Sequence, residues 1–261
     1  MRREQFIIDL MAGGRYTFTS EEALAYFGTS AVATRAAIRR LAADGKVAIP
    51  CRGFHVIVPP AYRDIGCLPP DQFMPDLFRF WSEPYYVALL SAAELHGAAH
   101  QRPQRFQVMT GKSRADIQCG KVYVEFILKK KVERAPVVMV NTPRGSLRVS
   151  SPEATALDIV SYQSKVGGIA VALAVLEELA DALDPRLLAD AVADRDMLPA
   201  AQRVGYLLDL LGRDDKTVLL YDAVAGRIAH AVPLAQALPV RGVSTDRRWK
   251  VRVNDDISVA G

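Results

Sequence analysis

Residues 29–45, TSAVATRAAIRRLAADG, predict a helix with one apolar and one basic face. Thr29 and Ser30 offer hydroxyl groups for an N-cap, and Gly45 ends the pattern, so we expect a helix over about 30–43. Its apolar face follows from spacings of three and four residues, which bring together Ala31, Thr34, Ile38 and Leu41. Three arginines lie outside that face, so one side of this helix needs a protein core and the other needs a polar partner.

The flanking sequence supplies the elements that would cover the apolar face. Residues 2–12 and about 20–27 read as two short helices, and Thr19 with Glu22 has the spacing of a capping box. Two β-branched runs, 46–50 and 54–58, surround Cys51-Arg52-Gly53 and predict a hairpin. Three helices followed by a hairpin form the layout of a winged helix-turn-helix, whose third helix enters the DNA major groove.

This layout predicts which residues contact DNA. Arg35 is placed to bond a guanine edge, while Arg39 and Arg40 lie further along the helix and suit phosphates. Arg52 at the hairpin tip suits a minor groove or a phosphate. The full candidate set is Thr29, Ser30, Val32, Ala33, Arg35, Arg39, Arg40 and Arg52. The alternative is that these arginines form only a solvated helix face and a hairpin charge.

Proline pairs at 59–60 and 69–70 bracket a stretch that suits neither a regular helix nor a central strand. We therefore expect a winged helix-turn-helix domain over 1–60, a linker over 61–71 and a second domain over 72–261. The second domain is expected to begin with helices at 72–81 and 84–99, to continue with four strands, and to be largely helical from 152 to about 225. The strands are expected at 106–110, 122–128, 137–141 and 147–149, with a final one at 249–253. The predicted fold class is α+β, with a mixed α/β second domain whose C-terminal half is rich in helices.

Charge is distributed unevenly along the 261 residues, whose net charge is +4. Residues 1–60 carry 8 basic and 5 acidic side chains, residues 61–150 carry 13 and 8, and residues 151–261 carry 12 and 16. A basic surface favours a polyanion because binding releases counterions. The first two thirds of the chain are therefore the part expected to meet nucleic acid.

Three segments of the second domain resemble the AbiEi antitoxins of type IV toxin–antitoxin (abortive infection) systems. They are PYYVALLSAAELHGAAHQRPQRFQVMT (84–110), KVYVEFILKKKV (121–132) and RGSLRVSSPEATALDIVSY (144–162). The resemblance extends over nearly the whole chain. It implies a transcriptional repressor that binds inverted repeats in its own operon. It also implies a C-terminal domain that counters a nucleotidyltransferase-like toxin without forming a stable complex with it.

Two further basic clusters have two interpretations each. Lys129, Lys130 and Lys131 with Arg134 follow a predicted strand and form either a solvated loop or a second nucleic-acid contact. The same choice applies to a C-terminal cluster, in which Trp249 is expected to anchor the core. That cluster comprises Arg241, Arg247, Arg248, Lys250 and Arg252.

Catalytic activity is not expected, although two sequence patterns resemble those of a metal site and of a nuclease. His96 and His100 have the spacing of metal ligands on one helix face, yet no third ligand is near in sequence. Asp116, Glu125 and Lys129 suggest a magnesium nuclease, but residue 127 is Ile where the Glu-x-Lys pattern needs Lys. A Mg-dependent nuclease and a winged helix that binds only protein are the alternatives to a repressor.

The remaining features are those of an ordinary cytoplasmic chain. Cys51, Cys67 and Cys119 are odd in number and lack Cys-x-x-Cys spacing, so free thiols are expected. No uncharged apolar run approaches the ~20 residues of a membrane helix. We expect no metal and no cofactor.

Overall fold

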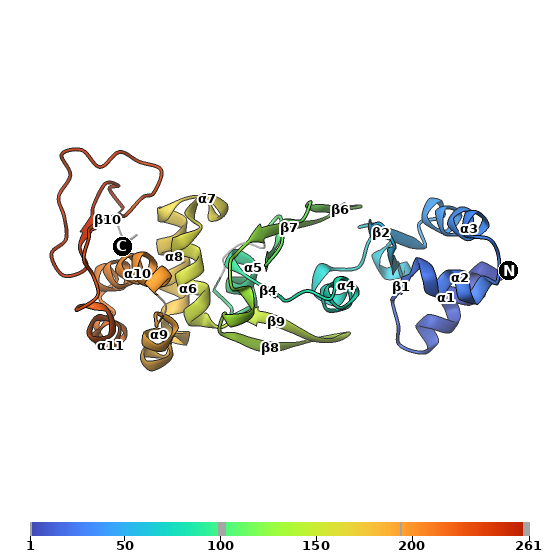
Figure 1. Cartoon of the computed structure of the whole chain (residues 1–261), viewed down its shortest axis with the longest axis horizontal. Helices are drawn as coiled ribbons and strands as arrows, with labels where there is room; N and C mark the ends of the chain where they lie inside the picture. Colours follow the sequence, from blue (N-terminus) through green and yellow to red (C-terminus); the bar gives the residue numbers. More distant parts are fainter. Residues whose placement is uncertain (1, 99–102, 194, 258–261) are drawn as a thin grey trace. The chain divides into compact units, whose positions relative to one another are not determined.

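The computed structural model describes residues 2–98, 103–193 and 195–257, which divide into two compact units (Figure 1). The first unit comprises 1–86, 104–133 and 139–148, and the second comprises 87–103, 134–138 and 149–261. This division by internal contacts differs from a division at 61–71. Whether function divides at 61–71 stays a prediction.

The first unit begins with three helices and a hairpin. The helices are α1 (Arg2–Ala12), α2 (Ser20–Phe27) and α3 (Ala31–Ala43), and the hairpin strands are β2 (Val47–Cys51) and β3 (Phe54–Ile57). Helix α2 begins with the expected capping box, in which Thr19 and Glu22 bond each other's backbone N–H groups. These elements enclose an aromatic core in which the rings of Phe6 and Phe18 lie 5.0 Å apart. The expected order of three helices and a hairpin is confirmed.

A short strand that the sequence analysis missed widens the hairpin to three strands. Strand β1 (Thr17–Thr19) pairs antiparallel with β3, which gives the order β1-β3-β2. Only three residues long and placed directly before a helix, β1 is too short to show a period of two. Because β1 pairs with β3 and directly precedes α2, it holds the hairpin next to the start of α2.

Residues 61–71 are packed into the first unit. They begin within one 3₁₀ turn, Pro60–Tyr62, and end within another, Pro70–Gln72, and the side chains of Cys67 and Leu68 are completely buried. Helix α4 (Met74–Trp81) follows and buries Leu77 and Phe78. We call residues 61–71 the connector below.

The larger sheet has six strands in the order β6-β7-β5-β4-β9-β8. Strands β5 (Phe106–Thr110) and β7 (Val122–Leu128) coincide with the prediction and pair in parallel, whereas β6 (Ile117–Cys119) pairs antiparallel with β7. The others are β4 (Tyr85–Val87), β8 (Val137–Thr142) and β9 (Gly145–Ser150), with β4 parallel to β9. A 3₁₀ turn, η3 (Val132–Arg134), precedes β8. Strand β6 was not expected, because three residues give little pattern.

One predicted helix is wrong in part. Residues 84–99 are predicted to be helical, but 85–87 form strand β4, and within the described residues 84–98 only α5 (Leu89–Leu95) is helical, while residue 99 lies outside the described residues. Tyr85, Tyr86 and Val87 are aromatic or β-branched and all buried, which favours a strand inside a sheet. Gly97 then stops the helix with a positive φ of 80°.

The second unit is mostly helical. Its helices are α5, α6 (Pro152–Ser161), α7 (Gln163–Val166), α8 (Ile169–Leu179), α9 (Pro185–Ala191), α10 (Leu198–Leu210) and α11 (Asp214–Val224), with 3₁₀ turns at Ala180–Ala182 and Arg195–Met197. In Figure 1, α6, α8, α10 and α11 group together, and a long terminal segment folds back over α10. That segment carries the parallel pair β10 (Val232–Pro233) and β11 (Val251–Arg252), where a strand was expected at 249–253. The α+β class with a helix-rich C-terminal half is confirmed.

Candidate nucleic-acid interface

Helix α3 divides into a packed face and an exposed face. Ser30 caps its start by accepting a bond from the Ala33 N–H at 3.2 Å. Thr34, Ile38 and Leu41 are buried, as their spacing predicts, and Thr34 shares a hydrogen bond of 3.1 Å with Thr29. Ala31 was expected on this face but is exposed, so the packed stripe begins one turn later, at Thr34.

The exposed face of α3 carries apolar methyl groups at its start and arginines along its length. Val32 is 68% exposed, and Ala33, Arg35, Arg39 and Arg40 are exposed as well. Within the described residues, none of these three arginine side chains forms a hydrogen bond or ion pair. Three positive charges on one helix therefore lack counter-ions in the parts of the chain that the structure describes.

The hairpin tip offers a single cation. Arg52 is exposed between β2 and β3, next to Gly53, whose φ of 88° suits glycine in a tight turn. Phe54 and His55 are buried instead of projecting, which limits the accessible tip to Arg52. The tip is anchored, because the Gly53 carbonyl accepts a bond of 2.9 Å from the Ser20 N–H.

His55 is a buried titratable group beneath the hairpin. Its ring stacks on Phe18 with centroids 4.9 Å apart, and its Nε2 lies 2.9 Å from the Ser20 hydroxyl. Its Nδ1 has no hydrogen-bond partner in the described structure. Burial lowers the pKa of His55 to about 4, so the imidazole is neutral near pH 7.

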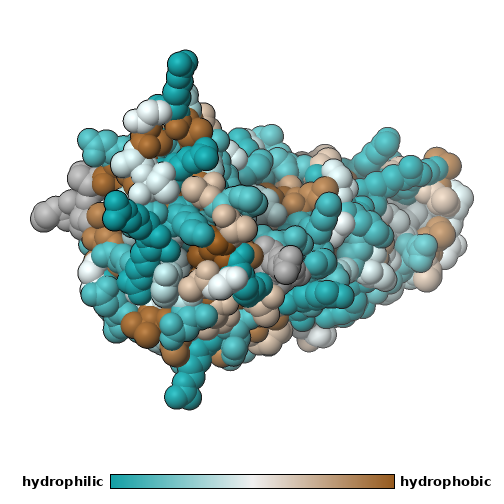
Figure 2. All heavy atoms as spheres, turned by 60° about the vertical axis from the view of Figure 1, so that its left-hand side comes forward, coloured by the Kyte–Doolittle hydropathy of each residue, from teal (hydrophilic) through white to brown (hydrophobic). Residues whose placement is uncertain are grey.

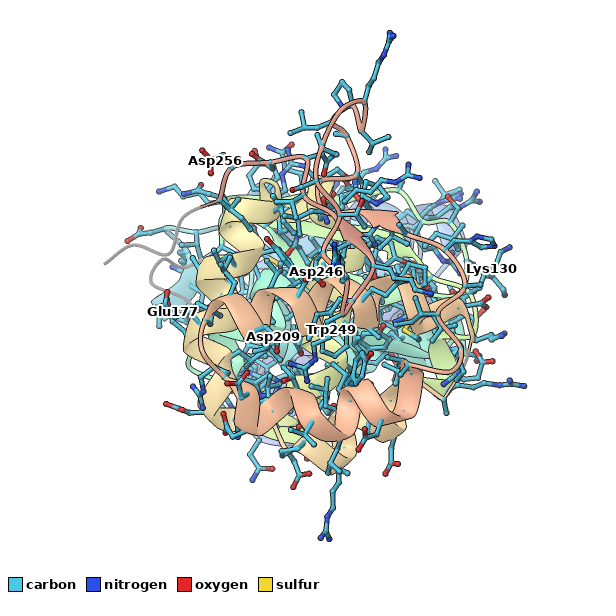
Figure 3. The ribbon with its side chains drawn as sticks, turned by 90° about the vertical axis from the view of Figure 1, so that its left-hand side faces the viewer. Lys130, Glu177, Asp209, Asp246, Trp249 and Asp256 are labelled. Atoms are coloured by element: carbon cyan, nitrogen blue, oxygen red, sulfur yellow. The ribbon has the colours of Figure 1, made fainter. Side chains whose placement is uncertain are left out.

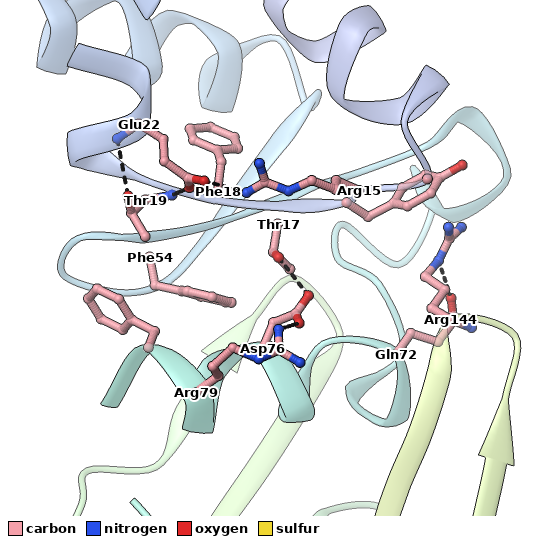
Figure 4. Close-up of a pocket in the computed structure, with 13 residues that line it drawn as sticks. Arg15, Thr17, Phe18, Thr19, Glu22, Phe54, Gln72, Asp76, Arg79 and Arg144 are labelled. Atoms are coloured by element: carbon pink, nitrogen blue, oxygen red, sulfur yellow. Dashed lines mark hydrogen bonds and ion pairs between the residues drawn. The ribbon is translucent and has the colours of Figure 1, made fainter. Parts of the chain in front are cut away.

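A cleft of about 480 Å³ separates β1 and α2 from α4 (Figure 4). The Thr17 hydroxyl donates to Asp76 at 2.7 Å, and Asp76 also pairs with Arg79. On the other side, Arg144 donates to Gln72 at 2.8 Å, and its guanidinium carbon lies 3.2 Å from the centroid of the Tyr16 ring. Apart from Asp76 and Arg79, the paired side chains lie more than 50 positions apart in sequence, so no local pattern predicts these contacts.

Charges in this cleft neutralise one another. Arg15 pairs with Glu22, and Arg79 pairs with Asp76. Arg144 is the remaining cation among these residues, and its guanidinium stacks on the Tyr16 ring. The cleft therefore works as a polar junction between the three-helix part and α4.

The basic tract after β7 lies on the surface. Lys130, Lys131 and Arg134 are exposed, and Lys131 adopts a positive φ of 56°. Lys129 is half-buried, with its ammonium 5.3 Å from the centroid of the Tyr86 ring. Lys130, Lys131 and Arg134 are therefore accessible to a charged partner.

The residues of the nuclease alternative are engaged in structural bonds. Asp116 accepts a hydrogen bond from the Phe126 N–H at 3.0 Å. Glu125 is buried and accepts a bond of 3.1 Å from Gln107. Among the described residues, no group of three or more His, Cys, Asp or Glu side chains is arranged to hold a metal ion. His96 bonds the Ser150 carbonyl at 2.7 Å, while His100 lies outside the described residues.

The C-terminal basic cluster is partly used inside the second unit. Trp249 is 1% exposed and donates from Nε1 to Asp209 at 2.6 Å, which confirms its expected place in the core. Arg248 pairs with the same carboxylate at 2.9 Å, and Lys250 donates to the Ile228 carbonyl. Asp209, Asp246 and Trp249 lie close together in Figure 3. Of the five cluster cations, Arg248 thus ties the terminal segment to α10, and Lys250 ties it to the turn after α11.

Hydrophobic residues on the face shown in Figure 2 appear as separate groups among hydrophilic ones. No helix in the described ranges is long and apolar enough to cross a membrane.

Comparisons with known proteins agree with this fold. Residues 86–210 match the AbiEi antitoxin C-terminal domain, which here runs from β4 to the end of α10. The fold is similar to the crystal structure of the Rv2827c protein from Mycobacterium tuberculosis, with a TM-score of 0.68 and 19% identity over 95% of this chain and 89% of that one. Among curated proteins, none matches the sequence. The match over residues 86–210 confirms the expected resemblance of this part of the chain to the AbiEi antitoxins.

Proposed function

We propose that this protein is an AbiEi-type antitoxin that represses its own operon by binding inverted repeats in double-stranded DNA through α3 and the hairpin. The observation that carries the proposal is the exposed face of α3, where Arg35, Arg39 and Arg40 have no counter-ion among the described residues. A helix with a buried opposite face and unpaired arginines fits a groove lined by phosphates.

The proposed roles follow the position of each residue along the helix. The N-terminal turn, with Thr29, Ser30, Val32 and Ala33, approaches base edges, where small side chains and methyl groups meet thymine. Arg35 reads a guanine. The remaining cations hold phosphates: Arg39, Arg40 and, from the hairpin, Arg52. A second nucleic-acid contact is proposed at Lys129, Lys130, Lys131 and Arg134.

A mobility shift with the upstream intergenic region tests this function and separates it from a winged helix that binds only protein. When a protein neutralises several DNA phosphates, the logarithm of its binding constant K falls steeply with the logarithm of the salt concentration. We expect a specific shift at low salt that weakens steeply as salt rises. A protein-interaction module would give no specific shift even at low salt, and that result would reject the repressor.

Replacing Arg35 by alanine is expected to weaken operator binding by ~1–3 kcal/mol and to relax preference at one base position. Arg39→Ala is expected to weaken binding to all DNA sequences about equally. It should also reduce the slope of log K against log salt concentration by ~1. Arg186→Ala, at an exposed position on α9 in the second unit, is the matched charge control. Equal weakening of operator and random DNA by Arg35→Ala would contradict the base-reading role.

The antitoxin role is proposed for residues 72–261, with 1–60 as the DNA-binding domain and 61–71 as the connector between them. In this scheme the chain is a cytoplasmic, non-enzymatic protein without cofactor or membrane partner. It counters a nucleotidyltransferase-like toxin without a stable complex. The acidic balance of residues 151–261, with 16 acidic and 12 basic side chains, supports a region that stays off DNA.

Repression and antitoxicity are expected to separate in the full-length chain. The connector is packed into the first unit, so point variants are preferable to truncation. With the toxin expressed from an independent promoter, Arg35→Ala/Arg39→Ala/Arg40→Ala should restore growth like the wild type and lose repression of an operon reporter. The Arg186→Ala control should retain both. Loss of growth rescue by a folded triple variant would place antitoxicity in the same surface.

A further inference from the structure

Two buried thiols meet where the connector touches strand β6. Cys67 is completely buried and Cys119 is 8% exposed. The two thiols are close enough for each to shift the pKa of the other. Neither lies on the exposed face of α3, so the repressor proposal leaves this pair without a role.

The two backbone segments that carry these thiols cross in close contact at Gly66 and Gly120. The Lys121 N–H donates to the Ile65 carbonyl at 2.8 Å. A Cβ built on Gly120 would lie 2.8 Å from the Gly66 Cα, so only glycine fits this crossing. A disulfide requires two backbones this near, with both side chains directed at each other.

We propose that Cys67 and Cys119 form a reversible intramolecular disulfide when the protein meets a peroxide, as a redox-sensitive clasp between the connector and β6. The inference does not depend on DNA binding.

Cys119 is the thiol that a peroxide would reach first, because it retains some exposure. Its sulfur attacks one peroxide oxygen, the O–O bond breaks, and the thiol proton leaves with the released oxygen as water. The product is a sulfenic acid on Cys119. The Cys67 sulfur then attacks that sulfur, the S–O bond breaks, and the Cys67 proton leaves with the hydroxide as a second water. Two thiols and one hydrogen peroxide thus yield one disulfide and two waters, and a dithiol reductant reverses the bond.

The pKa shifts are consistent with Cys119 as the attacking thiol. The neighbouring Cys67 thiol lowers the pKa of Cys119 to about 7, against the opposing effect of burial. The neighbouring Cys119 thiol raises the pKa of Cys67, and burial adds to it. A thiol with a depressed pKa carries more thiolate, which is the form that attacks a peroxide.

The clasp should stiffen the crossing between the connector and β6. The Lys121 N–H already donates to the Ile65 carbonyl, two residues before Cys67. In hydrogen exchange, the Lys121 amide should therefore slow on oxidation.

Peptide mapping of the full chain tests the proposal, and the third cysteine supplies a matched control. In Cys51→Ser, hydrogen peroxide should remove two hydrogens from the intact mass and join the Cys67 and Cys119 peptides. The midpoint of thermal unfolding should rise by roughly 5–10 °C, and dithiothreitol should reverse both changes. Cys67→Ser should gain oxygen instead of forming the link. Oxygen added to Cys51→Ser without a Cys67–Cys119 link, or a link only between chains, would overturn the clasp.

Discussion

Gly205→Ala is expected to lower the free energy of unfolding by about 3 kcal/mol or more. Gly205 lies in α10, and a Cβ there would sit 2.3–2.5 Å from three ring atoms of Trp249. Alanine favours a helix over glycine by about 1 kcal/mol, which this overlap far outweighs. Urea denaturation measures the loss, and thermal unfolding should show a fall of roughly 6–12 °C.

The Trp249 ring cannot retreat from the new methyl group. Its Nε1 is fixed by a 2.6 Å bond to Asp209, and the ring packs edge-to-face with Tyr221, with centroids 5.3 Å apart. Its backbone carbonyl accepts from Gln202 at 2.9 Å. Moving the ring would break a buried hydrogen bond as well as leave a cavity.

Two comparisons isolate this cause. Gly226→Ala meets nothing within 4 Å and should change stability little. In a Trp249→Leu background, Gly205→Ala should be neutral or stabilising, because the smaller side chain leaves room for the methyl group. An equal loss in both backgrounds would show that the cost does not come from Trp249.

The same contacts explain why the domain extends past the matched residues 86–210. Gln202 and Arg203 are buried on α10, and they donate to carbonyls of the terminal segment, including that of Pro233 at 2.8 Å. Asn254 closes the segment through bonds to Ala235. The terminal segment therefore completes the core on one side of α10, and a truncation at 210 would expose buried polar groups.

Local patterns in the sequence were sufficient for the three-helix part. A capping box, a serine cap and a stripe at spacings of three and four place α2 and α3 within one or two residues. The same patterns placed Arg35, Arg39 and Arg40 outside the core, and they are exposed. Each of these features depends on residues within one or two helical turns.

Features that depend on distant residues were not predictable in this way. Strand β4 was read as helix because its buried, apolar sequence has no alternation. The junction between Thr17 and Asp76 and the pair of Cys67 with Cys119 join positions about 50–60 residues apart. Single-sequence periodicity carries no information on such pairs, which arise only when the sheet and the connector are folded.

Lowering the pH from about 7 to 4 is expected to remove about 3 kcal/mol of stability through His55 alone. Burial holds its folded pKa at about 4, against an ordinary value of 6.5. Between these values the unfolded chain binds a proton that the folded chain does not, so the full stability is present above pH 6.5 and is lost as pH falls toward 4. The free energy of unfolding, measured by urea denaturation across this range, should fall accordingly.

Two substitutions isolate the contribution of His55. His55→Phe keeps a ring against Phe18 but cannot titrate, so its stability should vary less with pH between about 6.5 and 4.5. His230→Gln, at an exposed site, should leave the wild-type slope unchanged. Carboxyls such as Glu83 act at lower pH. Although burial raises the pKa of Glu83, bonds from Arg114 and Lys112 hold it below its ordinary 4.5. An unchanged slope in a folded His55→Phe would mean that the imidazole is protonated inside the hairpin, which its apolar stack on Phe18 opposes.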